Sequence, residues 1–188
     1  MHSILITGVS ASGKTTLARQ AATLLGLACH DYADLMLKAD PALLGKDAIQ
    51  ALSPAERQGI YDKVTAKLPS WFGPSSSDHA TILFENHLSV IQDGHVITFQ
   101  TVDYRRYNAC GLAVINADPP AIHHRRATDP ARRRSLGTVD QIAWQQTVNE
   151  SQAAIVSDYL EIPLATIRND DMEQAAGELA HWAGGWLR

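Results

Sequence analysis

Cysteine is scarce in this chain of 188 residues, and Cys29 and Cys110 are the only two. They lie far apart and lack the spacing of metal ligands, which argues against a zinc site and a disulfide framework. No apolar run reaches the roughly 20 residues that cross a bilayer. Near Met1 no basic segment precedes an apolar stretch and a cleavage site, so we expect no secretory signal. These absences predict a cytoplasmic protein with buried, reduced thiols.

A large charge of one sign is also missing, because the formal net charge is −4. Mild acidity disfavours nucleic acid as a partner. The length suits one compact domain with its own core. The basic residues are uneven, however, and five arginines crowd into one short stretch: Arg125, Arg126, Arg132, Arg133 and Arg134.

Short apolar segments that favour strands alternate with segments of helical periodicity. The predicted strands are 3–7, 27–30, 81–84, 112–116 and 164–168. The predicted helices are 15–25, 32–44 with a break at Pro41, 53–68, 120–126, 138–159 and 172–186. Asp93-Gly94, between two apolar stretches, predicts a hairpin-like turn. The alternation predicts an α/β fold with a five-stranded, mostly parallel sheet and helices on both faces.

The segment Gly8-Val-Ser-Ala-Ser-Gly13-Lys14-Thr15 matches the Walker A pattern, with a predicted strand before it and a helix after it. Glycine at both ends permits backbone torsions that let successive N–H groups wrap a phosphate chain. Lys14 supplies a charge for the β- and γ-phosphates, and the Thr15 hydroxyl suits Mg²⁺. The predicted ATP-binding residues here are Gly8, Ser10, Ala11, Ser12, Gly13, Lys14, Thr15 and Thr16.

A carboxylate at the end of a neighbouring strand is expected to help hold Mg²⁺. Glu85 follows the predicted strand 81–84 and is the favoured candidate. Asp118 follows another strand and is its rival, although a helix cap before Pro119 and Pro120 is the simpler role for it.

The arginine stretch favours a catalytic lid. Phosphoryl transfer spreads negative charge over the γ-phosphate oxygens, and arginines on a closing segment neutralise it. A solvated basic loop or a nucleic-acid patch is the alternative.

At this point the chain resembles the archaeal-type adenylate kinases, a compact branch of the P-loop nucleoside monophosphate kinases. The resemblance covers most of the chain in order. It is carried by residues 6–18, by Asp34-Leu-Met-Leu37, by Leu52-Ser-Pro, by Glu85-Asn86-His87-Leu88, by Ala117-Asp118-Pro119 with Arg125-Arg126, by Asp129, Arg132 and Arg134, by Gln146 with Asn149, and by Arg168-Asn169.

The resemblance implies a single P-loop kinase domain over residues 1–188, with an acceptor-binding insertion at about 32–70 and a lid at about 126–138. It implies that ATP and Mg²⁺ are the cofactors and that Asn169 lies near the adenine of ATP. Arg126, Arg132 and Arg134 would act with Lys14 in catalysis. Asp34, Asn86 and His87 would line the acceptor pocket.

The sequence departs from that family at the acceptor side. Gln50 stands where the family has an arginine that grips the acceptor phosphate, and Glu85 replaces an aspartate. A monophosphate needs a positive partner, so Arg105 or Arg106, with Gln100 beside them in sequence, are candidates. If neither serves, the acceptor is an uncharged alcohol.

Three functions therefore stay open. The first is a nucleoside monophosphate kinase that converts ATP and AMP to two ADP. The second is a kinase of a nucleoside or another small hydroxylated metabolite, with Asp34 or Glu85 as general base. The third is a nucleotide-dependent ATPase switch that acts on a macromolecular partner. The partner expected in the first two is a small-molecule acceptor, and the sequence leaves the donor base and any homo-oligomer open.

Overall fold

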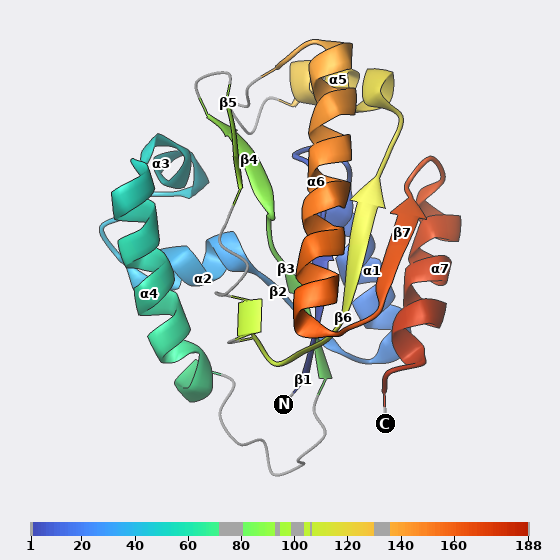
Figure 1. The fold of residues 1–188 in the computed structure, drawn as a ribbon, viewed down its shortest axis with the longest axis horizontal. Coiled ribbons are helices and arrows are strands. Elements are labelled where there is room, and N and C mark those ends of the chain that lie inside the picture. Colours follow the sequence, from blue (N-terminus) through green and yellow to red (C-terminus); the bar gives the residue numbers. More distant parts are fainter. Residues whose placement is uncertain are drawn as a thin grey trace.

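The computed structural model describes residues 2–71, 81–92, 95–98, 104–105, 107–129 and 136–187. A central sheet lies between two groups of helices, and a two-stranded hairpin stands beside it (Figure 1). This architecture confirms the predicted P-loop α/β fold. The proposed boundaries of the acceptor insertion and of the lid stay predictions.

The main sheet has five parallel strands in the order β2-β3-β1-β6-β7. These strands are β1 (His2–Thr7), β2 (Ala28–Asp31), β3 (Thr81–Glu85), β6 (Ala109–Asn116) and β7 (Leu164–Arg168). Leu5 of β1 lies between Phe84 and Leu112 in the register of its two neighbours. The direction in which successive strands are added to the sheet reverses at β1. In α/β folds such a reversal leaves a crevice at the carboxyl ends of the strands, and ligands bind there.

Helices cover both faces of this sheet. They are α1 (Lys14–Leu25), α2 (Tyr32–Ala39), α3 (Lys46–Ala51), α4 (Pro54–Trp71), α5 (Pro119–Thr128), α6 (Val139–Leu160) and α7 (Met172–Gly184). α1 and α7 pack together on one face, where Ile4, Leu17 and Leu179 are fully buried. The buried strands are apolar on both sides, as a fully covered parallel sheet requires.

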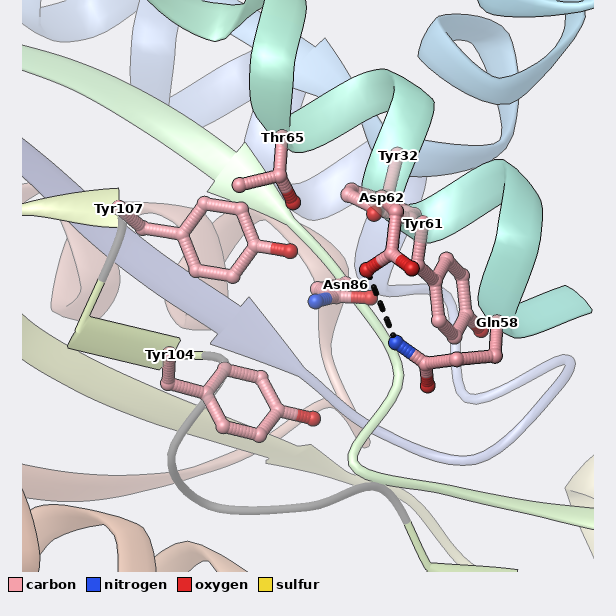
Figure 2. A pocket seen from close by; sticks show the side chains of 8 residues that line it. All are labelled: Tyr32, Gln58, Tyr61, Asp62, Thr65, Asn86, Tyr104 and Tyr107. Carbon is pink, nitrogen blue, oxygen red and sulfur yellow. Dashed lines mark hydrogen bonds between the residues drawn. The ribbon is translucent and has the colours of Figure 1, made fainter.

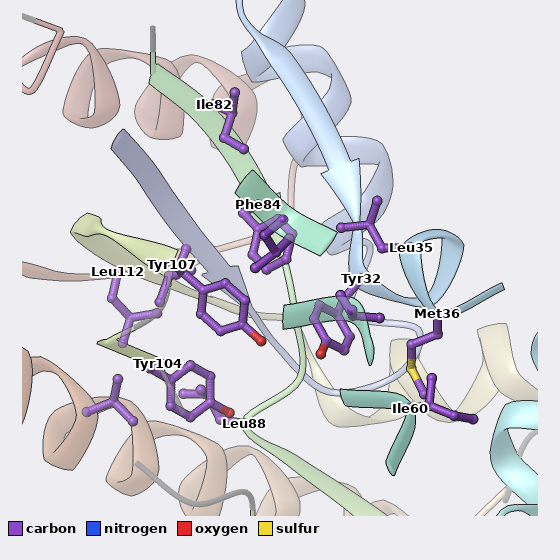
Figure 3. Close-up of a cluster of buried hydrophobic side chains, with 14 of the residues drawn as sticks. Tyr32, Leu35, Met36, Ile60, Ile82, Phe84, Leu88, Tyr104, Tyr107 and Leu112 are labelled. Atoms are coloured by element: carbon purple, nitrogen blue, oxygen red, sulfur yellow. The ribbon is translucent and has the colours of Figure 1, made fainter. Parts of the chain in front are cut away.

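The opposite face of the sheet carries an aromatic core. Tyr32, Phe84 and Tyr107 meet edge to face or tilted, with ring centroids 4.9 to 6.1 Å apart (Figure 3). Such pairs add to the free energy of burial because the positive ring edge faces a negative ring face. This core joins the start of α2 to β3 and to the segment before β6, and it forms the floor of the pocket described below.

Helix boundaries follow the capping signals in the sequence. Ser53 and Glu56 bond reciprocally at the start of α4, and Thr138 and Gln141 do the same at α6. The segment 32–44, predicted to be helical with a break at Pro41, is helical only to Ala39, where α2 ends, and a separate α3 begins at Lys46. The residue before a proline avoids helical torsions, and Asp40 precedes Pro41 in an extended conformation.

Both strands of the predicted hairpin are present. β4 (Ser89–Gln92) pairs antiparallel with β5 (His95–Thr98), while the predicted turn at 93–94 lies outside the described residues. Within the described ranges, no helix combines the length and apolarity needed to cross a bilayer.

Candidate active site

The loop between β1 and α1 has the backbone shape that its glycines predict. Ala11 and Gly13 take positive φ angles of 69° and 88°, and Ser12 N donates to the Val9 carbonyl over 3.2 Å. A Cβ atom at Gly8 would lie 2.5 Å from the carbonyl oxygen of Ile115. The loop therefore needs glycine at this close approach to β6. Thr16 is exposed on the first turn of α1.

Lys14, Thr15 and Glu85 meet at the carboxyl end of β3. The Thr15 hydroxyl donates to Glu85 Oε2 over 2.6 Å, and Lys14 Nζ lies 3.8 Å from the same oxygen. Glu85 is 2% exposed and Lys14 is 7% exposed. A buried carboxylate beside a hydroxyl is a hard oxygen set that fits Mg²⁺. The residues present therefore fit the metal that the sequence predicts at Thr15 and Glu85.

Asp118, the rival carboxylate, has the capping role that the sequence favours for it. Its Oδ2 accepts from Ala121 N over 3.3 Å at the start of α5. The side chain is engaged with a helix end, whereas Glu85 is engaged with the phosphate loop.

Two arginines from the last turn of α5 hold the outer carbonyls of the phosphate loop. Arg126 donates from Nε and Nη2 to the Ser10 carbonyl at 3.1 and 3.0 Å, and Arg125 donates to the Ala11 carbonyl at 3.3 Å. Arg126 is also 3.0 Å from Gln145 Oε1. In this conformation Arg126 braces the loop from outside, a contact that the lid hypothesis missed. Arg132 and Arg134 lie outside the described residues.

Asn169 reaches the phosphate loop from the end of β7. Its Nδ2 donates to the Ser12 carbonyl over 2.7 Å, and its backbone N donates to Asn116 over 2.7 Å. A Cβ atom at Gly13 would lie 2.1 Å from Asn169 Nδ2. The structure brings Asn169 to the predicted ATP side of the loop, and its role toward adenine stays a prediction.

Asn86 and His87 continue directly from Glu85 toward the other side of the loop. Asn86 N donates to the Ile6 carbonyl over 2.9 Å, and Asn86 Oδ1 accepts from His87 N over 2.7 Å. His87 keeps some exposed surface as a residue, but burial of its imidazole lowers the pKa to about 3. Lys14 and Arg57 lower this pKa further, while Asp31 and a backbone hydrogen bond to Gly8 oppose them. The imidazole is therefore neutral at physiological pH.

A pocket opens beside Asn86, between α4 and the aromatic core (Figure 2). It holds about 320 Å³ of empty space, including the part open to solvent. Aromatic rings, amides, a hydroxyl and one carboxylate form its lining: Tyr32, Gln58, Tyr61, Asp62, Thr65, Asn86, Tyr104 and Tyr107. The sequence analysis predicted Asn86 here, but it missed the tyrosines, which are separated by up to 75 positions and converge only in the fold.

Asp34, another predicted acceptor residue, is exposed and forms an ion pair. Lys46 Nζ lies 2.7 Å from Asp34 and also contacts Asp31. Burial raises the pKa of Asp31, but hydrogen bonds from Lys46 and Ala33 hold it below its ordinary value. Lys46 therefore neutralises both carboxylates at the start of α2.

Arg57 is a buried cation that the sequence analysis missed. It is 9% exposed on α4, and its Nη2 donates to the Ile49 carbonyl over 3.1 Å, next to Gln50 in α3. Its positive charge helps to lower the pKa of His87. The signal for it was its spacing of four from Tyr61, which puts both on one helix face.

Of the other predicted acceptor residues, the structure describes the side chain of Arg105 alone, and it is not part of the pocket lining. The Arg105 guanidinium lies over the Tyr159 ring of α6, 4.4 Å from its centroid. Only the helical backbone of Gln50 is described, and Gln100 and Arg106 lie outside the described residues.

A profile of the AAA domain family matches residues 7–143, which include the whole phosphate loop, Glu85 and α5. The chain belongs to the AAA domain family. That match spans most of the chain and includes both the phosphate loop and the residues that line the pocket.

Curated relatives add a more specific resemblance. Adenylate kinase of Thermoplasma volcanium is 29% identical over 181 residues, covering 93% of this chain and 96% of that protein. Adenylate kinase of Thermoplasma acidophilum is 25% identical, with 89% of each covered. The resemblance to archaeal-type adenylate kinases is therefore confirmed.

A solved structure of shikimate kinase from Acinetobacter baumannii, in complex with shikimate, superposes with a TM-score of 0.63 at 15% identity. The match covers 100% of this chain and 96% of that one. At this identity the likeness concerns the fold. With the family match and the adenylate kinase relatives, it identifies the chain as a P-loop kinase.

Proposed function

We propose that this protein transfers the γ-phosphoryl group of ATP to a nucleoside monophosphate, in the simplest case AMP, with Mg²⁺. One observation carries the proposal: Glu85, which contacts Lys14 and Thr15, is followed directly by Asn86, which lines the pocket. The phosphate loop and the tyrosine-lined pocket thus share one strand end. The adenylate kinase relatives support the same reading.

The residues of this site divide the work between donor and acceptor. Backbone N–H groups of the loop and Lys14 would hold the donor phosphates, while Thr15 and Glu85 would hold Mg²⁺. The bound metal supplies charge neutralisation at the phosphate oxygens. Catalysis in this chemistry is mainly positioning and charge stabilisation, so no covalent intermediate is required.

Arg57 would supply the cation that a monophosphate acceptor needs. It is buried, fixed by the Ile49 carbonyl, and close enough to His87 to affect its pKa. A guanidinium binds phosphate oxygens through two parallel hydrogen bonds. Neutral His87 lies on the same side, where it can bond to an acceptor without adding charge.

A kinase of an uncharged nucleoside or hydroxylated metabolite is the second candidate. The pocket lining favours it, because the lining residues that the structure describes include neither lysine nor arginine. The two candidates differ in whether the acceptor itself carries a phosphate.

A panel of acceptors decides between them. The purified protein would receive Mg-ATP with AMP, CMP, UMP, GMP or dTMP, the matching nucleosides, shikimate, or water alone, and ADP release would be followed. The proposal expects turnover that depends on a monophosphate. Turnover with a nucleoside or shikimate alone would favour the second candidate, and hydrolysis that no acceptor changes would contradict both kinase readings and favour an ATPase switch.

A further inference from the structure

Side chains from outside the phosphate loop hold three of its consecutive carbonyls. Arg126 donates to the Ser10 carbonyl at 3.1 and 3.0 Å, and Asn169 Nδ2 donates to the Ser12 carbonyl over 2.7 Å. The carbonyl between them also accepts from an arginine of α5. The donors come from two separate places, the last turn of α5 and the residue after β7. The outer side of the loop is therefore held peptide by peptide.

These contacts fix the direction of the N–H groups in the loop. In a trans peptide the carbonyl points away from the N–H group of the next residue. Carbonyls held outward at Ser10 and Ser12 therefore turn the N–H groups of Ala11 and Gly13 inward, where a phosphate chain would lie. A group that is already fixed loses less freedom when its ligand binds, and this increases affinity.

Gln145 of α6 holds the guanidinium that contacts Ser10. Its Oε1 accepts from Arg126 Nη2 over 3.0 Å, and the two residues are only 4% and 6% exposed. Nη1 of the same arginine donates to the Leu136 carbonyl over 3.4 Å. α5 and α6 pack together near the carboxyl ends of the strands, which brings these side chains together (Figure 1). The guanidinium is thus fixed on one side by the loop and on the other by α6.

We propose that Gln145 is a positioning residue for the donor triphosphate. A guanidinium has five N–H donors and no acceptor, so an acceptor opposite the loop can fix the plane in which Arg126 grips the Ser10 carbonyl. Gln145 acts through that arginine and the loop, and Asn169 acts in parallel on the Ser12 peptide. The inference rests on the use of ATP in the proposed function and is independent of the acceptor.

Mg-ATP binding by Gln145→Leu, measured by titration calorimetry, tests the proposal. Leucine has a similar size but accepts no hydrogen bond, so we expect the Kd to rise about tenfold, the scale of one hydrogen bond to a charged group. The KM for the acceptor should stay within about twofold, as expected for a separate site. Gln145→Glu should restore ATP binding, because a carboxylate accepts from arginine. Gln152→Leu, a matched change of a half-buried residue on α6, should leave the Kd unchanged.

Double variants show whether Gln145 works through Arg126. Adding Gln145→Leu to Arg126→Gln should weaken Mg-ATP binding little further, because the contact between the two side chains is already lost. Adding it to Asn169→Ala should roughly multiply the two single effects, since these residues hold different peptides. Effects that multiply in the Arg126→Gln background would mean that Gln145 acts by another route, and they would overturn the inference.

The remaining outcomes separate positioning from a general loss of structure. An unchanged Kd in Gln145→Leu, or equal rises in the Kd for Mg-ATP and the KM for the acceptor, overturns the inference and leaves the proposed function standing. If Gln145→Leu does not fold, Gln145→Met takes its place, because methionine keeps an unbranched chain and its sulfur is only a weak acceptor. Wild-type protein that binds no Mg-ATP would overturn the proposed function and the inference together.

Discussion

The Thr15 hydroxyl donates to Glu85 Oε2 over 2.6 Å, and this contact joins the first turn of α1 to the end of β3. Parallel strands place their carboxyl ends at one edge of the sheet, so β1 and β3 deliver the phosphate loop and the acid to the same point. The register sets Glu85 opposite Ile6. Ile6 stands two positions before Gly8, the first residue of the phosphate loop. The contact thus follows from topology and from the choice of residue at each strand end.

Glu85→Gln should raise the Mg²⁺ concentration needed for half-maximal activity and lower kcat about hundredfold, as the loss of one key electrostatic group does. Glutamine can still accept from Thr15, so the fold should persist. The measurement is activity against Mg²⁺ concentration. Asp118→Asn is the control, since asparagine caps a helix equally well, and a larger effect there would reassign the metal site.

Arg57→Gln should raise the KM for a monophosphate acceptor about tenfold to hundredfold, because a charge-assisted hydrogen bond is lost. The KM for ATP should change little. Arg19→Gln, an exposed change on α1, is the matched control. If both variants kept the wild-type acceptor KM, Arg57 would have no part in acceptor binding.

Gly13→Ala should destabilise the protein by about 2 kcal/mol or more, since alanine resists a left-handed φ and its Cβ would displace the Asn169 amide from Ser12. ATP binding should weaken with it. Gly177→Ala is the contrasting change, because nothing lies within 4 Å of its Cβ position on α7. It should stabilise by up to about 1 kcal/mol in urea unfolding. Equal behaviour of the two variants would contradict this view of the loop.

His87 should make stability depend on pH. Its folded pKa of about 3 lies below the ordinary value of 6.5, so the unfolded chain takes up a proton first as pH falls through that window. The contribution is fully present above pH 6.5 and should shrink by about 1 to 2 kcal/mol from pH 7 to pH 5. Urea unfolding of wild type and His87→Gln at both values gives the difference. Parallel losses in both proteins would show that the imidazole is not held neutral.

Much of the fold was predictable because its signals are local. The Walker A segment, the alternation of apolar strands with amphipathic helices, and the Ser53 and Thr138 caps each act within a few residues. The break at Pro41 was predicted, but apolar residues at 43 and 44 extend the helical pattern beyond it, whereas the next helix begins only at Lys46.

The tyrosine-lined pocket was less predictable because its parts are distant in sequence. Asn86 was found through its place after Glu85, but Tyr32, Tyr61 and Tyr107 meet only when α2, α4 and the segment before β6 assemble. Arg57 reads as an ordinary helix-surface residue in the sequence. Its burial against the Ile49 carbonyl depends on how α3 and α4 pack.

ATP labelled in its γ-phosphoryl group shows where that group is transferred. Wild-type protein and Lys14→Ala would be incubated with labelled Mg-ATP and each accepted nucleotide or nucleoside, and the products separated. The account predicts label on the acceptor with the wild type and none above background with Lys14→Ala, since the loop lysine neutralises the transferring phosphate. Label found only in inorganic phosphate, or equal transfer by the variant, would contradict it.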